Sequence, residues 1–258
     1  MPQMLGLRSL LERQPPEQRD DTLRVWRIAV IVTVAIGLSK HLPIGASIAG
    51  LAVAAAQLMI PLRYALTSKD GDDGIGYSAA GLGRDLPMVI GIFLLTSVPF
   101  WFAHEAWWTW LGQADGSGSR LAVPEGDLAP FMVASGWISP TISAPIAMLE
   151  LIAIHTIGVA LPEELFYRGF LQPKLCQSFA DRPIGAGFVW NPGIAVAAAL
   201  FAAAHFLGEY NPARLGPFFP ALLFGLLRRR SGSIASAVLL HAAFNVLGAM
   251  LFAGLAPR

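Results

Sequence analysis

The sequence predicts an all-α fold, a polytopic bundle of about seven transmembrane helices. Only 14% of its 258 residues are charged, and 55% are hydrophobic, whereas a soluble domain has roughly 25% charged residues. The apolar residues gather in runs that approach the length of about 20 residues that a transmembrane helix needs. The predicted spans cover residues 24–40, 43–66, 86–111, 141–172, 192–208, 214–229 and 231–254.

Prolines and glycines mark the borders of several predicted helices. Asn191-Pro192 and Asn211-Pro212 indicate helix starts, because proline fits the first turn, where its missing N–H is not needed. Residues 112–137 form the longest polar connection and contain a Gly-Ser-Gly-Ser stretch at 116–119, which is typical of a flexible loop. We therefore expect a single transmembrane domain over residues 23–254, preceded by a polar segment at 1–22.

The positive charges orient the chain. With the N-terminus in the cytoplasm, most lysines and arginines outside the spans fall on the cytoplasmic side, as the positive-inside rule requires. Residues 1–22 lack the apolar core of a secretory signal, so the first span is expected to remain as a signal anchor. Arg228–Arg230 lie directly between two apolar stretches, which favours a topology anchor. We expect the lipid bilayer, and no nucleic acid, as a partner.

Six polar residues interrupt the apolar runs at 141–254 and are the candidate functional residues. Ionisable groups in membrane-length segments are costly, so they indicate functional sites by default. Polar contacts between membrane helices more often use Ser, Thr or Gly, which makes a purely structural role for the whole set improbable. The residues are Glu163, Glu164, Arg168, His205, His241 and Asn245.

Helical spacing separates the two glutamates. Glu164 and Arg168 are four residues apart and share one face of an α-helix, the spacing at which side chains pair. Glu163 is five residues from Arg168 and should point about 140° away from it. An ion pair between Glu164 and Arg168 would offset much of the cost of burying two charges. Glu163 would then be free to act as a general base.

The remaining polar residues favour water attack on a carbonyl group. His241 and Asn245 are four apart and share a face, where they would stabilise an oxyanion, while His205 would help to hold the attacking water. His155 is assigned a structural role. The sequence contains no zinc-protease, nucleophile-elbow or phosphate-loop motif, and its single cysteine, Cys176, excludes an intrachain disulfide. We expect neither a cofactor nor a metal.

At this point the pattern resembles a known family. Glu-Glu-x-x-x-Arg, Phe-x-x-x-His and His-x-x-x-Asn occur in this order on successive predicted helices, and together with the segment before His241, which contains Arg230-Ser231-Gly232-Ser233, they resemble the CPBP family of glutamic-type intramembrane proteases. That family includes the CAAX-prenyl endopeptidases and the bacterial Abi proteins. The resemblance covers about residues 155–250. Its members commonly have about eight helices, so an eighth helix is possible.

The resemblance implies roles position by position. Glu163 corresponds to the catalytic base, Glu164 and Arg168 to supporting residues, and His205, His241 and Asn245 to the remaining catalytic residues. The implied activity is cleavage of a membrane-anchored protein or peptide, in the bacterial inner membrane and with a cytoplasmic N-terminus. The segment 209–220 narrows the likeness to glutamic myxosortases, which would process C-terminal sorting tails. Two alternatives stay open, a zinc-dependent membrane hydrolase and a non-enzymatic scaffold or transporter.

Overall fold

The computed structural model describes residues 16–39, 41, 46–67, 75–76, 78–114 and 148–255. These residues form two compact units that interleave in the sequence. Unit 1 comprises Met1–Gly81 with Pro162–Ala237, and unit 2 comprises Leu82–Leu161 with Val238–Arg258. The Gly-Ser-Gly-Ser stretch at 116–119 lies outside the described residues. The expected single domain over 23–254 stays a prediction.

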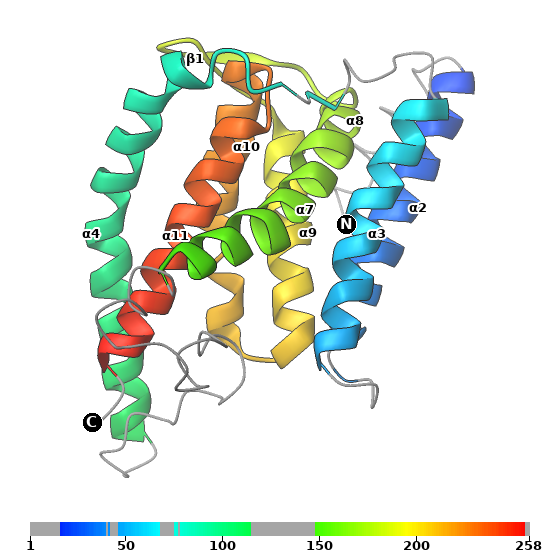
Figure 1. Ribbon diagram of the computed structural model, residues 1–258. Coiled ribbons are helices and arrows are strands. Elements are labelled where there is room, and N and C mark those ends of the chain that lie inside the picture. Colours follow the sequence, from blue (N-terminus) through cyan, green and yellow to red (C-terminus); the bar gives the residue numbers. More distant parts are fainter. Residues whose placement is uncertain are drawn as a thin grey trace. The chain divides into compact units, whose positions relative to one another are not determined.

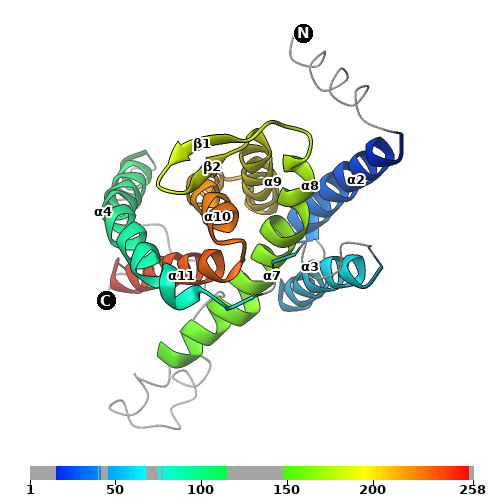
Figure 2. The ribbon, with the colours of Figure 1, turned by 90° about the horizontal axis from the view of Figure 1, so that it is seen from above.

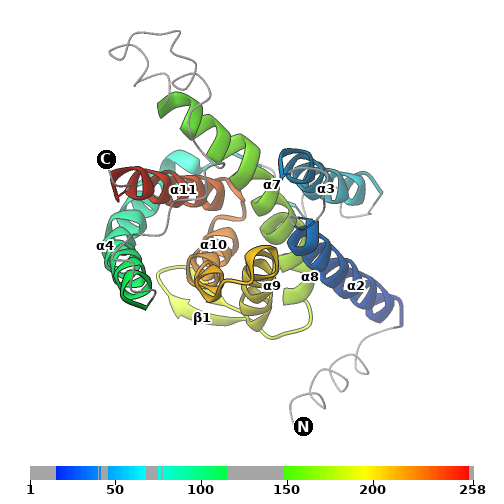
Figure 3. The ribbon, with the colours of Figure 1, turned by 90° about the horizontal axis from the view of Figure 1, so that it is seen from below.

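Unit 1 is a group of helices packed around α9 (Figures 1 and 3). Its core joins buried aromatic and aliphatic residues of several helices, among them Phe166 and Phe201, both at most 2% exposed. Burial of such side chains supplies the main stabilising term in this part of the molecule. The helices of unit 1 are α2 (Pro16–Ser39), α3 (Ala46–Thr67), α8 (Gln172–Cys176), α9 (Pro192–Glu209), the short 3₁₀ helix η4 (Pro212–Leu215) and α10 (Phe218–Ser231).

Unit 2 contains α4 (Leu82–Ala114), residues 148–153 in α-helical form, the π-helix η2 (Ile154–Ala160) and most of α11 (Ala235–Leu255). Phe244 on α11 packs against Phe93 and Phe100 on α4, with ring centroids 5.6 and 5.8 Å apart. These aromatic contacts pack α11 against α4. The chain passes into unit 1 within α7 (Leu161–Glu164), which is followed by a second π-helix, η3 (Leu165–Leu171).

The two predicted helix starts are present, and capping residues also mark the border between α10 and α11. Asn191 accepts a hydrogen bond from the backbone N–H of Gly193 at 2.8 Å and begins α9, with Pro192 in the first turn. Asn211 begins η4 in the same way. Gly232 ends α10 with a φ of 73°, and Ser233 then accepts from the N–H of Ala235 at 3.1 Å. The Arg230–Ser233 motif is thus a stop signal followed by a start signal.

Two features correct the expected all-α bundle. A two-stranded antiparallel hairpin, β1 (Arg182–Gly185) and β2 (Phe188–Trp190), joins α8 to α9 and packs against α10 (Figure 2). Its turn holds Gly185, Ala186 and Gly187 at positive φ, a conformation that glycine adopts readily. The predicted spans 24–40 and 231–254 also differ from the observed helices at their starts, because α2 begins at Pro16 and α11 at Ala235.

Apolar helices of membrane-crossing length are present, and the seven-span bundle stays a prediction. Within the described ranges, three helices are long and apolar enough to cross a bilayer, and Ala235–Met250 is a shorter apolar helix. Large apolar side chains such as Leu66 and Leu95 are more than 70% exposed, as expected of surfaces that face lipid. The three long helices are Ile48–Thr67, Leu82–Ala103 and Pro192–Glu209.

Candidate active site

A buried ion pair lies at the centre of the candidate site in unit 1. Nη1 of Arg168 donates to Oε1 of Glu164 at 2.9 Å, and both side chains are at most 1% exposed. A second guanidinium nitrogen, Nη2, donates to the backbone carbonyl of Ala221 on α10 at 3.3 Å. The pairing predicted from the four-residue spacing is therefore present. Such additional hydrogen bonds are what allow a buried pair to repay its desolvation.

Three aromatic rings surround the same guanidinium. The Cζ atom of Arg168 lies 4.6 Å from the ring centroid of Phe201, 5.2 Å from that of Phe224 and 5.8 Å from that of Tyr167. Each contact is within the range in which a ring face attracts a cation. The rings come from α9, α10 and η3, so the arginine joins three helices of unit 1. No helical spacing within one segment could have revealed this cage.

The π-helix η3 begins just after Glu163 and Glu164, inside the Glu-Glu-x-x-x-Arg motif. In a π-helix the backbone bonds run from residue i to residue i+5, and Pro162, just before this segment, cannot donate to the helical ladder because it lacks an N–H. Glu163, half-buried, is close enough to Arg168 to interact with it electrostatically. The expectation that Glu163 points about 140° away from Arg168 assumed an α-helix throughout, and the direction of its side chain stays a prediction.

Two buried hydroxyl groups, those of Tyr167 and Thr33, were not among the residues predicted from the sequence. Tyr167 and Thr33, on α2, are 1% and 2% exposed, and their hydroxyls lie close enough to interact. Neither hydroxyl meets the geometry of a hydrogen bond to another described residue. Tyr167 also interacts electrostatically with Glu163. Both residues stand in apolar stretches of the sequence, where a single Thr or Tyr does not indicate a functional site.

His205 on α9 carries a defined tautomer. Its Nδ1 lies 3.0 Å from the backbone carbonyl oxygen of Phe201, and because a carbonyl oxygen only accepts, Nδ1 must be the protonated nitrogen. In the neutral ring Nε2 is then an acceptor. The ring also contacts that of Phe201, with centroids 4.5 Å apart. His205 is half-buried.

His241 and Asn245 belong to unit 2. They lie one turn apart on the regular α-helix α11, so the predicted shared face is present. His241 is 5% exposed and Asn245 is half-buried. Glu163, Glu164, Arg168 and His205 belong to unit 1. The meeting of these two groups in one active site stays a prediction.

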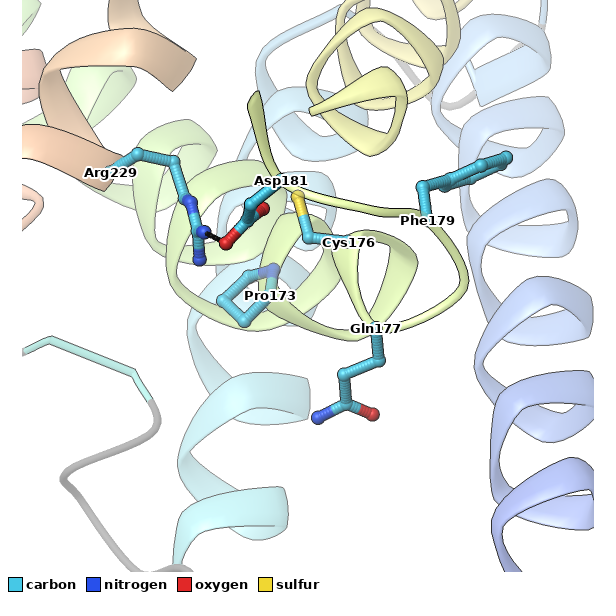
Figure 4. A pocket seen from close by; sticks show the side chains of 6 residues that line it. All are labelled: Pro173, Cys176, Gln177, Phe179, Asp181 and Arg229. Carbon is cyan, nitrogen blue, oxygen red and sulfur yellow. Dashed lines mark hydrogen bonds and ion pairs between the residues drawn. The ribbon is translucent and has the colours of Figure 1, made fainter. Parts of the chain in front are cut away.

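A small cleft of about 300 Å³ lies at the end of α8 in unit 1 (Figure 4). Arg229 forms an ion pair with Asp181 at its rim, and Asn191 donates to the same carboxylate at 2.7 Å. Burial raises the pKa of the Cys176 thiol to about 11, so this thiol is protonated at neutral pH and unsuited to nucleophilic attack. The lining residues are Pro173, Cys176, Gln177, Phe179, Asp181 and Arg229.

Comparisons with known proteins identify one family. Residues 145–247 match the family described as type II CAAX prenyl endopeptidase Rce1-like. All six candidate residues lie inside the matched segment. The family is a protease family, part of the larger CPBP family, which supports a membrane peptidase. No curated protein and no solved structure matches the chain. Within the described residues, no group of three or more His, Cys, Asp or Glu side chains is arranged to hold a metal ion.

Proposed function

Starting from the Rce1-like family identified over residues 145–247, we propose that this chain is a glutamate-dependent intramembrane endopeptidase. The observation that carries the proposal is the Glu164–Arg168 pair, buried, fully enclosed and adjacent in sequence to the half-buried Glu163. The buried ion pair gives Glu164 a structural role, and we assign the chemistry to the neighbouring carboxylate of Glu163. Placed in a low-dielectric site, such a carboxylate is suited to general-base catalysis.

In the first step Glu163 takes a proton from a water molecule, whose oxygen attacks the carbonyl carbon of the scissile peptide bond. His205 assists because Nε2, the acceptor nitrogen of its neutral ring, accepts a hydrogen bond from the second O–H of that water, which stays bonded to the attacking oxygen. Arg168 keeps Glu164 occupied and adds positive charge near Glu163. This division of labour explains why two neighbouring glutamates serve different roles.

In the second step the carbonyl oxygen becomes an oxyanion, which His241 and Asn245 stabilise by donating hydrogen bonds. The tetrahedral intermediate then collapses, the C–N bond breaks, and Glu163 returns its proton to the leaving amine nitrogen. The products are a free carboxylate and a free amine. No further reactant is needed besides water.

The proposed substrate is a membrane-anchored protein or peptide, and the proposed location is the bacterial inner membrane with a cytoplasmic N-terminus. The apolar helices restrict the reaction to chains that enter or lie against the bilayer. The likeness of segment 209–220 to glutamic myxosortases favours a C-terminal sorting tail, made of a short motif, a membrane helix and a basic end. A prenylated CAAX peptide is the other substrate to test.

The test uses the purified full chain in proteoliposomes with two fluorogenic substrates, a membrane helix with a C-terminal basic tail and a farnesylated CAAX peptide. We expect cleavage of the helical tail by the wild-type protein and a loss on the order of 10²–10⁴ in rate for Glu163→Gln. His41→Gln is the matched control, since His41 lies on the surface. Near-normal turnover by Glu163→Gln, or activity lost on chelation and restored by zinc, would overturn the mechanism.

A further inference from the structure

The β1–β2 hairpin of unit 1 presents an apolar tip on the surface. Residues 183–187, Pro-Ile-Gly-Ala-Gly, are all exposed and carry no polar side chain, and Ile184 is 57% exposed. An exposed run of consecutive apolar residues indicates a binding surface. In the part of the chain that the structure describes, β1 pairs only with β2, so its outer edge offers backbone N–H and C=O groups that need polar surroundings. The tip is therefore apolar in its side chains and polar in its backbone.

Two exposed arginines border this tip. Arg182 begins β1, and its side chain forms no ion pair or hydrogen bond with another described residue. Arg230, near the end of α10, holds its Cζ atom 4.8 Å from the ring centroid of Phe188 on β2. The neighbouring carboxylate of Asp181 is already paired with Arg229. The charge left at the border of the tip is therefore positive.

The hairpin adjoins the end of a helix that is long and apolar enough to cross a bilayer. That helix, α9 (Pro192–Glu209), begins two residues after Trp190, the last residue of β2. At the same end of unit 1, α10 packs against both α9 and β2 and ends in three arginines (Figures 1 and 2). Tryptophan is enriched where membrane helices meet the headgroups. Because an unpaired strand edge cannot enter the hydrocarbon, the hairpin belongs at the headgroup level.

We propose that the β1–β2 hairpin is an interfacial anchor that docks on anionic phospholipid. Ile184 enters the boundary between headgroups and acyl chains, while Arg182 and Arg230 contact the lipid phosphates. Apolar burial and attraction to anionic lipid act together in such surface anchors, and an arginine can lay its stem along apolar surface while its charge stays among the headgroups. A topology anchor needs only the charges, whereas this surface also needs the apolar tip. The proposal is independent of the proposed peptidase activity, since it concerns lipid binding alone.

A fluorophore beside the tip tests the proposal in the full chain. Pro183→Cys is made in a Cys176→Ala background, which removes the single native cysteine, and is labelled with an environment-sensitive dye. The labelled protein is reconstituted into vesicles of phosphatidylcholine, alone or mixed with phosphatidylglycerol, that contain lipids with a nitroxide on the acyl chain. We expect the nitroxide to quench the dye more strongly when phosphatidylglycerol is present.

Three variants separate the two parts of the surface. Arg182→Gln and Arg230→Gln should each weaken docking in the anionic vesicles by about fivefold, and Arg230→Lys should restore most of the loss. Ile184→Asp should lower quenching in both kinds of vesicle. Arg214→Gln is the matched control, because it removes the same charge in η4, which follows the other end of α9, and it should leave the quenching unchanged.

Arg182→Gln is the decisive variant, because the side chain that it replaces has no bonded partner in the hairpin whose loss could unfold it. Quenching that is equal with and without phosphatidylglycerol would overturn the proposal. So would quenching that Arg182→Gln and Ile184→Asp leave at the level of the unmodified hairpin, or that Arg214→Gln lowers as much as Arg182→Gln does.

Discussion

The two groups of candidate residues are held in opposite ways. In unit 1, the Arg168 guanidinium has a carboxylate, a carbonyl and three aromatic rings around it. In unit 2, His155 is buried with no hydrogen-bond partner among the described residues. The difference indicates that the Glu164–Arg168 pair is built for stability, whereas the proposed chemistry belongs to the other candidate residues. Mutations of the pair should therefore affect unfolding, and mutations of His241 or Asn245 should affect turnover.

The largest expected effect is on the Glu164–Arg168 pair. Arg168→Ala or Glu164→Ala leaves one buried charge without its partner, and each should lower the free energy of unfolding by roughly 3–5 kcal/mol. Thermal melting in detergent measures the loss. The double variant Glu164→Leu with Arg168→Met should recover much of the stability, because apolar residues of similar volume often replace such pairs well. If either single variant melts like the wild type, the pair is not a stabilising element.

His241→Ala and Asn245→Ala should show the reverse pattern. Removal of one oxyanion donor lowers kcat by about 10²–10³, equivalent to about 2.7–4 kcal/mol in the barrier. The melting temperature should stay close to that of the wild type, because neither side chain is part of the Arg168 cage. Single-turnover kinetics on the helical substrate measure the effect. A large drop in melting temperature with unchanged kcat would reverse the assignment.

The two asparagines sharpen the same contrast. Asn191 is fully buried, caps α9 and donates to Asp181 and to the carbonyls of Cys176 and Phe179. Asn191→Ala should therefore lower the free energy of unfolding by about 2 kcal/mol, while the rate per folded molecule stays within about threefold of the wild type. Asn245→Ala is the matched comparison. Loss of rate without loss of stability in Asn191→Ala would contradict the division between the groups.

The smallest effect concerns the Cys176 thiol and pH. Its pKa is about 11 in the folded chain against 9.0 for an ordinary thiol. Between about pH 9 and pH 11 the unfolded chain loses the thiol proton, whereas the folded chain keeps it. The contribution of Cys176 to the free energy of unfolding is therefore fully present below about pH 9 and falls as the pH rises through this window. Melting temperatures of the wild type and Cys176→Ala, compared at pH 8 and pH 10.5, should converge or cross with rising pH. A constant difference would contradict the shifted pKa.

The features that sequence alone determined are local ones. Helix starts at Asn191 and Asn211 and the pairing of Glu164 with Arg168 each depend on residues within about five positions of one another. The approximate positions of the apolar helices follow from composition in the same way. These local interactions do not depend on how the rest of the chain folds, because capping and four-residue pairing are short-range effects.

Only the tertiary structure decided the rest. The aromatic cage requires α9, α10 and η3 to pack together, and the π-helical form of η3 is not contained in an α-helical wheel. The β1–β2 hairpin had a local signal in the glycines around Ala186, yet its strands are too short to be recognised beside the apolar helices. The burial of His155 without a hydrogen-bond partner among the described residues is a property of the packed interior, and no spacing along a chain encodes it.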